Sequence, residues 1–195
     1  MVEVYQQEKW TLDALYPDHE SPAYQEALQS LEQQAEDFEK YREELKPEIT
    51  EQTFMSAVHD LEKFTRLANR VYSYAGLWFT EDTQNQAAQA LQAKIEAMMA
   101  DLQNQVMFFE LWWKQLDQDI ADRLKKNTGD FRYWLEEMRH YTPHTLSEPE
   151  EKILNIKNVT GFSALNTLYD SITNRYTFKI EDDGEVKDLT RGVLM

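Results

Sequence analysis

Apolar residues recur at intervals of three and four along most of the chain, the period of one buried face of an α-helix. The first such stripe follows Ser21 and Pro22, an N-cap with proline in the first turn, and it ends at Pro47. A second stripe begins near Thr50, and a third spans about residues 84–116. These stripes predict three long helices, which short linkers should arrange as antiparallel neighbours.

Shorter elements follow the third stripe. The pattern predicts helices over about 118–126, 130–141, 148–157 and 162–174. Ser147 and Glu150 have the spacing of a capping box at the start of one of them. Apolar and polar residues then alternate around the turn residues Asp183 and Gly184, which predicts a β-hairpin. Because a lone hairpin is marginal in water, we expect it to lie against the helices or another chain segment.

The predicted fold class is therefore mainly all-α, with long antiparallel helices in a bundle-like array and a small C-terminal β-hairpin. We divide the chain into an extended lead-in packed on the helices, a helical domain, the hairpin and the start of a following helix. Their ranges are 1–20, 21–175, 176–189 and 190–195. The last range ends in an apolar run without a cap, so we expect a helix that the sequence cuts short.

Charge narrows the function classes. With 20 basic and 36 acidic residues, the net charge is −16. Nucleic acids and anionic membrane surfaces both select clustered Lys and Arg, so neither partner is expected. The acidic residues either coat solvated helix faces or create a field that attracts basic ligands, and the count does not separate these readings.

Cysteine usage and the N-terminal segment bear on location. The chain has no cysteine, which excludes disulfides, thiolate catalysis and Cys-ligated zinc. The first residues lack the basic start and apolar run of a signal peptide, and no apolar stretch is long enough to span a bilayer. A cytoplasmic location is the default expectation.

Two histidines have the spacing of zinc ligands. His140 and His144 have the i, i+4 spacing that places two imidazoles on one helix face. However, Tyr141 stands where a metallopeptidase needs its general-base glutamate, and Pro143 favours a loop. Zinc also needs a third protein ligand. We therefore expect capping and loop packing here, and no metal.

Other candidate groups have simpler readings. His59 is expected to be an ordinary helix side chain, and neighbouring glutamates such as 136 and 137 should be solvated. Glu110 lies in an aromatic patch, 108–113, and should form a structural ion pair with Arg66, Arg70 or Lys114, since an unpaired buried carboxylate is costly. That patch and 72–79 are expected to be core, with a binding groove or a protein interface as alternatives.

Four segments carry a family resemblance. They are TLDALYP at 11–17 after Trp10, VYSYA at 71–75 with TEDT at 80–83, HTLSEPEEKIL at 144–154, and TGFSA at 160–164 with LYD at 168–170. In this order they resemble the N-terminal region of oligoendopeptidase F-like zinc metallopeptidases, of the thimet oligopeptidase-like M3 family. The likeness is collinear over nearly the whole chain.

The resemblance implies a function for a longer enzyme. The family hydrolyses short peptides with a zinc ion held by an HExxH helix and a downstream glutamate, all of which would lie beyond Met195. No catalytic, cofactor-binding or metal-ligating residue is therefore assigned here, and the chain alone is predicted to be inactive. The segment would form channel wall and scaffold, with an oligopeptide substrate and the missing catalytic domain as partners. The alternatives are a free-standing helical module that binds a protein or peptide, and an acidic bundle with no binding task.

Overall fold

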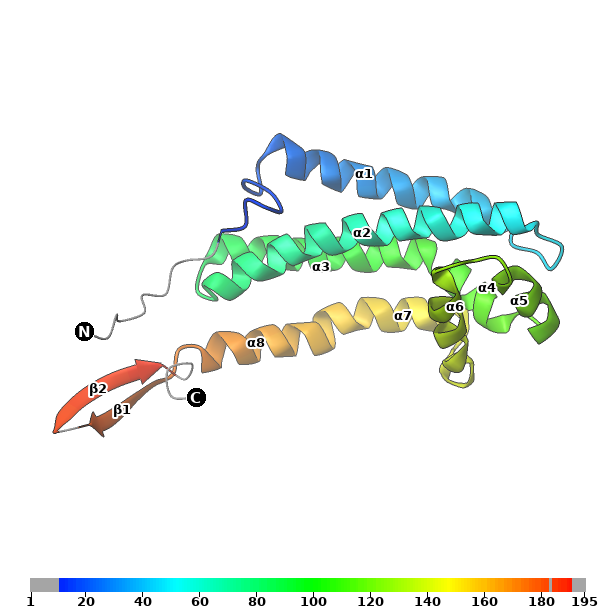
Figure 1. The fold of residues 1–195 in the computed structure, drawn as a ribbon. Coiled ribbons are helices and arrows are strands. Elements are labelled where there is room, and N and C mark those ends of the chain that lie inside the picture. The colour runs from blue at the N-terminus through cyan, green and yellow to red at the C-terminus, as the bar shows by residue number, and fades with distance from the viewer. Residues whose placement is uncertain (1–10, 183, 191–195) are drawn as a thin grey trace, which may run out of the picture.

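The computed structural model describes residues 11–182 and 184–190, and it is helical apart from one hairpin (Figure 1). The long helices are α1 (Pro22–Phe38), α2 (Glu51–Glu81) and α3 (Gln86–Val106). The shorter ones are α4 (Phe108–Gln115), α5 (Gln118–Lys125), α6 (Phe131–His140), α7 (Glu148–Asn158) and α8 (Ala164–Thr173). The strands β1 (Thr177–Asp182) and β2 (Glu185–Thr190) pair antiparallel. The predicted fold class is confirmed.

Side-chain caps fix where the long helices begin. Ser21, Thr50 and Asn85 precede α1, α2 and α3, and each side-chain oxygen accepts a backbone N–H from the first turn of its helix. These bonds satisfy amide groups that have no partner within the helix. The Ser21 cap was predicted from the sequence, and the second helix was predicted to begin near Thr50, but the Asn85 cap was not predicted.

The third predicted helix is divided. The chain was expected to form one helix over about 84–116, but α3 ends at Val106 and α4 begins at Phe108. Met107 between them keeps right-handed backbone angles (φ −62°, ψ −20°), and its N–H still bonds to Gln103. The apolar spacing continues across the change of direction because both helices bury their apolar side chains in the same core. The periodicity therefore did not reveal the division.

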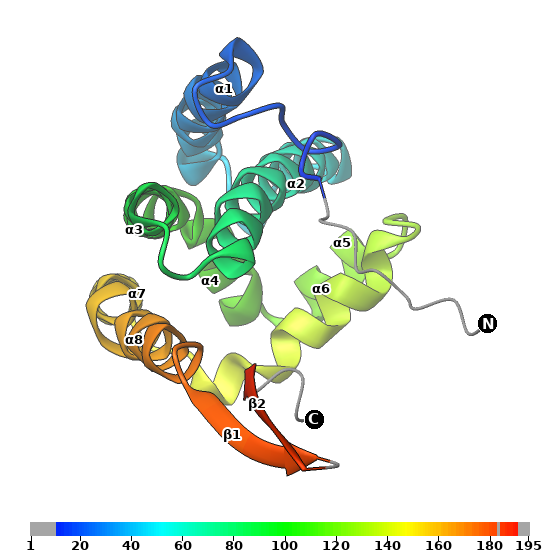
Figure 2. The same cartoon turned by 90° about the vertical axis from the view of Figure 1, so that its left-hand side faces the viewer.

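The core lies where the long helices meet α4 and α6. Its largest fully buried side chains come from α1, α2, α3, α4, α5 and α6 and are Trp113, Tyr24, Phe38, Phe54, Phe109, Leu31, Ile95, Leu124, Leu135, Val58 and Val71. Phe54 stacks on Trp113 with ring centroids 5.2 Å apart, and Phe38 meets Phe109 edge-on. Figure 2 shows α1, α2 and α3 end-on, as neighbouring rods.

The described part of the lead-in is held by aromatic contacts. Tyr16 is buried and lies edge-on to Tyr24 and Tyr74. Arg70 lies over the Tyr16 ring and donates a 2.6 Å hydrogen bond to the carbonyl oxygen of Leu15. From residue 11 onward the lead-in therefore packs on α1 and α2. The following helix was expected to start within 190–195, but Thr190 is the last residue of β2. Residues 1–10 and 191–195 lie outside the described residues.

The helices α7 and α8 form one continuous rod. They were expected to be separate, but the π-helical turn η3 (Val159–Ser163) joins them, and both lie beside α3 in Figure 1. The capping box at the start of α7 is present: Glu150 accepts the Ser147 backbone N–H at 2.9 Å and the Ser147 hydroxyl at 2.6 Å. A π-turn adds one residue to a helix without interrupting it. The added residue shifts the apolar spacing, and this shift had suggested two separate helices.

A polar cluster links the end of α1 to α2. The Asp60 carboxylate accepts the Tyr41 hydroxyl at 2.8 Å and the Lys40 ammonium at 3.3 Å, with Lys63 at 3.5 Å. Burial by itself raises the pKa of Asp60, but Tyr41, Lys40 and Lys63 outweigh it and leave the pKa below its usual value. Burial raises the pKa of Tyr41, and the hydrogen bond to Asp60 and the negative charges of Asp60 and Glu44 raise it further.

Replacing Asp60 by asparagine is expected to lower stability by about 0.5–1 kcal/mol at pH 7, since the pair is partly exposed and screened. A depressed carboxyl pKa contributes stability above the unfolded pKa and loses it as pH falls through the folded pKa. The difference between Asp60→Asn and the parent chain should therefore shrink below about pH 4. Urea unfolding at pH 7 and pH 3 measures this, with exposed Asp119→Asn as the control. If the difference in stability between Asp60→Asn and the parent chain grows toward low pH, then the Asp60 pKa is not lowered by these contacts.

In the part of the chain that the structure describes, no helix is both long and apolar enough to cross a bilayer. This agrees with the sequence, which contains no such stretch.

Candidate functional site

The main surface feature is the rod formed by α7, η3 and α8, residues 148–173, which we call the arm. Asn155 attaches it to α3: its side-chain amide donates to the carbonyl oxygen of Ala100 and to Oδ1 of Asn104, both at 2.9 Å. Near the far end of the arm, Gln84 donates a longer bond, 3.4 Å, to the carbonyl oxygen of Ser171. These bonds show which side of the arm faces the helical body.

The side of the arm toward the body carries small side chains. A line of partly buried positions recurs every four residues, at Asn155, Val159, Ser163, Thr167 and Ser171. Only Val159 among them is apolar. Five other residues of the arm are also partly buried, and these are Glu148, Glu151, Lys152, Gly161 and Thr173. The arm is therefore attached to α3 mainly through polar groups and close approach of the backbones.

The opposite side carries large apolar side chains, which we call the outer face. Its residues are Ile153, Leu154, Ile156, Phe162, Leu165, Leu168, Tyr169 and Ile172, each between 43% and 70% exposed. In α8 they fall at i, i+3, i+4 and i+7, and at 100° per residue they lie about 100–200° around the axis from Thr167. The amphipathic helix α8 thus turns its apolar stripe away from the body, which is the reverse of the usual arrangement.

The outer face is too large to be incidental. Eight large side chains that are about half exposed offer roughly 800 Å², more than the few hundred Å² of a typical monomer patch and similar to one side of a standard interface. Charge is also scarce in the α8 half of the arm, which contains a single charged residue, Asp170, in a chain with 29% charged residues, whereas α7 has five in eleven. Depletion of charge is a property of interface cores.

The hairpin extends the exposed apolar surface beyond the arm. Phe178 pairs with Leu189 and Ile180 with Lys187, so one face of the hairpin is mainly apolar. Phe178 and Ile180 remain exposed, as does Val186, and the hairpin projects from the end of α8 (Figures 1 and 2). The expectation that the hairpin lies against helices or another segment is thus wrong for the described residues, because no described segment covers its apolar face.

The base of the arm is fixed by charge. Arg42 forms two 3.1 Å hydrogen bonds to Glu148, the first residue of α7, and its guanidinium lies 4.2 Å from the Phe108 ring centre. The hydrogen bonds from Arg42 lower the pKa of Glu148 against the opposing effect of burial, and Lys152 adds to the lowering. The arm is therefore anchored at its start and held more weakly along its length.

The two histidines with metal-ligand spacing do not form a site. The helix α6 ends at His140, and His144 lies in the 3₁₀ turn η2 (Thr142–His144), so they do not share one helix face. His140 is exposed and lies 3.4 Å from Glu137. Within residues 11–182 and 184–190, no group of three or more His, Cys, Asp or Glu side chains is arranged to hold a metal ion.

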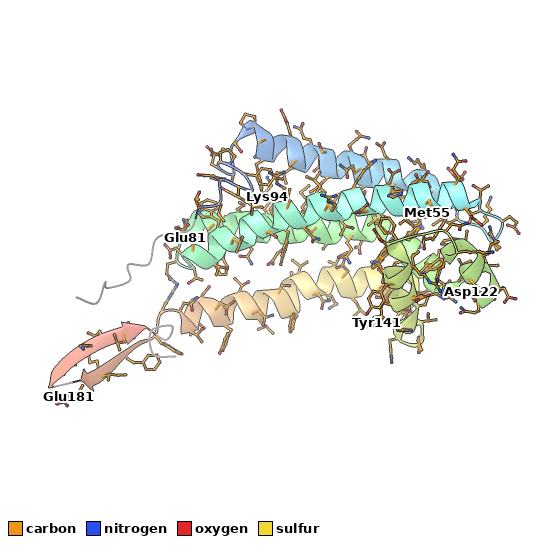
Figure 3. All side chains as sticks on the ribbon, viewed as in Figure 1. Met55, Glu81, Lys94, Asp122, Tyr141 and Glu181 are labelled. Carbon is orange, nitrogen blue, oxygen red and sulfur yellow. The ribbon has the colours of Figure 1, made fainter. Side chains whose placement is uncertain are left out.

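The remaining candidate side chains have structural partners. Glu110 pairs with Lys114, one of the three predicted partners, which confirms the predicted ion pair, and its side chain is 46% exposed. His59 lies 3.7 Å from Glu62 and meets the Phe131 ring edge-on. Glu136 has its pKa lowered by hydrogen bonds from Arg132 and Lys125. Figure 3 shows the side chains on the ribbon.

The aromatic patches divide between core and surface. Phe108, Phe109 and Trp113 are buried, as is Phe79, which confirms the core reading for most of both patches. Tyr72 is 45% exposed and lines a hollow of 430 Å³ bounded by α2, α3, the start of α4 and Trp134 of α6. The outer face of the arm, by contrast, was not singled out in the sequence, although its i, i+3, i+4 spacing was present.

A solved structure shows the class of fold to which this arrangement belongs. The chain is similar to the crystal structure of a candidate peptidase from Chlamydophila abortus, with 17% identity and a TM-score of 0.51. The match covers 94% of this chain and 31% of that one. At this identity the likeness establishes the fold alone.

A family model gives the more specific assignment. Residues 112–178 match the model described as Oligopeptidase F, for the N-terminal part of M3 peptidases. The resemblance to an oligopeptidase F-like N-terminal region is thereby confirmed. The matched segment begins in α4 and ends in β1, so it includes the whole arm. No curated protein matches the chain.

Proposed function

We propose that this chain is the N-terminal helical domain of an oligopeptidase F-like zinc metallopeptidase that hydrolyses short peptides in the cytoplasm. The family match over residues 112–178 carries the proposal. The exposed outer face supports it, since a domain of a larger protein needs a surface on which the rest can pack. The domain acts as scaffold and as wall of the channel that admits oligopeptides.

The described residues do not fit a zinc site, because no three of their carboxylates and imidazoles converge. Glu110 pairs instead with Lys114, and His140 with Glu137. In this proposal, zinc and the groups that activate water belong to the remainder of the polypeptide. This domain contributes no catalytic residue.

The test compares the 195-residue chain with the longer polypeptide that contains it. Each is treated with a chelator, given zinc, and assayed with a quenched-fluorescent oligopeptide. We expect zinc-dependent cleavage by the longer polypeptide and none by the 195-residue chain. The double variant His140→Ala/His144→Ala of the longer polypeptide should retain activity. Zinc-dependent turnover by the short chain, or loss of zinc binding in the double variant, would contradict the proposal.

The exposed outer face also favours a second candidate, a free-standing module that binds a helix or peptide of another protein. This candidate predicts that the 195-residue chain captures its partner without further sequence. An acidic bundle with no binding task does not explain why eight large apolar side chains face solvent on one side of the arm.

A further inference from the structure

The arm shows a mismatch between its two sides. Its inner side carries Asn155, which bonds to α3, and farther along Thr167 and Ser171, which are partly buried. Leu165, Leu168 and Tyr169 face away from the body. A helix gains stability by burying its apolar stripe, so an arm whose only neighbour was the body would turn the other way. The orientation observed therefore indicates a second neighbour on the outer side.

The apolar residues that α8 contributes to the outer face indicate what kind of element packs on the arm. Apolar side chains at i, i+3, i+4 and i+7 form ridges that fit into the grooves of another helix. A single strand cannot add to α8 by backbone hydrogen bonds, because a helix offers no free sheet edge. The scarcity of charge on α8 excludes a partner that is recognised mainly by ion pairs.

Two observations indicate where the neighbour comes from. The similar crystal structure extends far beyond the matched region, which is 31% of its chain. The family model includes the arm, so the arm is part of what defines this peptidase region. Both place the arm in a polypeptide with enough additional chain to cover it.

We propose that an amphipathic helix from the remainder of the same polypeptide, outside residues 1–195, packs on the outer face, making the arm a middle layer between that helix and α3. This inference rests on the proposed function and adds the location and type of the domain contact. The small inner side allows close approach to α3, and the large outer side supplies the apolar contact. The outer face then holds the two parts of the peptidase together and does not line the substrate channel.

Thiol labelling tests the contact, because the chain has no cysteine of its own. Leu168→Cys lies in the outer face, and Ser30→Cys is an exposed control on α1. Maleimide labelling is followed by mass spectrometry of the peptide that contains each position, so cysteines elsewhere do not interfere. In the 195-residue chain both positions should react quickly. In the longer polypeptide, labelling at residue 168 should slow by about tenfold or more, as expected for a site that reacts only after local opening.

The outcomes separate this inference from the proposed function. Zinc-dependent cleavage by the longer polypeptide, together with equally fast labelling of Leu168→Cys in both proteins, would overturn the domain contact and leave the function standing. Absence of cleavage would overturn the function. If labelling of the 195-residue chain is slow and depends on protein concentration, and sedimentation shows a dimer, then a second copy of the chain covers the outer face and the proposed helix does not. Tyr169→Cys provides the same readout if Leu168→Cys fails to fold.

Discussion

Replacing Trp113 by alanine is expected to lower the free energy of unfolding by about 3–5 kcal/mol, the cost of removing a large, fully buried aromatic side chain. Its indole N–H donates a 2.8 Å hydrogen bond to the carbonyl oxygen of Leu135, and its ring stacks on Phe54. Arg139 in turn donates to the carbonyl oxygen of Trp113 at 2.6 Å. One side chain thus joins α4 to α2 and α6.

Chemical denaturation of the 195-residue chain, followed by circular dichroism, measures this effect. Trp134→Ala is the matched control, since Trp134 is 40% exposed on α6, and it should cost about 1 kcal/mol or less. Trp113→Phe keeps an aromatic ring but loses the bond to Leu135, so we expect an intermediate loss. Equal destabilisation by Trp113→Ala and Trp134→Ala would show that the α4–α6 contact is not part of the core.

Placing a carboxylate on the outer face by Leu168→Glu is expected to affect the short and long proteins differently. In the 195-residue chain the position is solvent-exposed, so the free energy of unfolding should change by about 0.5 kcal/mol or less. In the longer polypeptide the same carboxylate would be buried without a partner. A loss on the order of 3 kcal/mol is then expected, with reduced peptidase activity.

Asn166→Glu is the matched control for Leu168→Glu. It adds the same charge to the same helix, at an exposed position beside the apolar stripe, and should be nearly neutral in both proteins. The comparison uses the denaturation midpoint of each variant in each protein. If Leu168→Glu is as well tolerated in the longer polypeptide as Asn166→Glu, then the outer face remains in water and the proposed domain contact is wrong.

Local signals in the sequence were sufficient for most of the helices. The caps at Ser21 and Thr50 and the capping box at Ser147 are interactions between residues three apart, so a reader of the sequence can see both partners. The apolar period likewise located the buried stripes of α1 and α2. The division at Met107 was missed because the helix changes direction there without a Gly or Pro to mark it. The π-turn between α7 and α8 contains Gly161, and the segment was taken as a gap between two helices.

The candidate functional residues were predicted less well than the helices. Sequence patterns drew attention to His140, His144 and Glu110, and the structure leaves all three as surface or structural side chains. The family resemblance, carried by short segments in a fixed order, was the more informative signal, and the match over residues 112–178 confirms it. The apolar residues of α8 were equally visible, but their spacing does not say whether anything covers them.

The sequence by itself determined the helical class, the Ser21 cap, the Ser147 capping box, the hairpin and the resemblance to oligopeptidase F, because each depends on residue types at short, fixed separations. Only the tertiary structure decided that the arm turns polar side chains toward α3 and apolar ones toward solvent. Amphipathic spacing defines a stripe but not the direction in which it points, and that direction is set by contacts such as those of Asn155 with Ala100 and Asn104, more than fifty residues away along the chain.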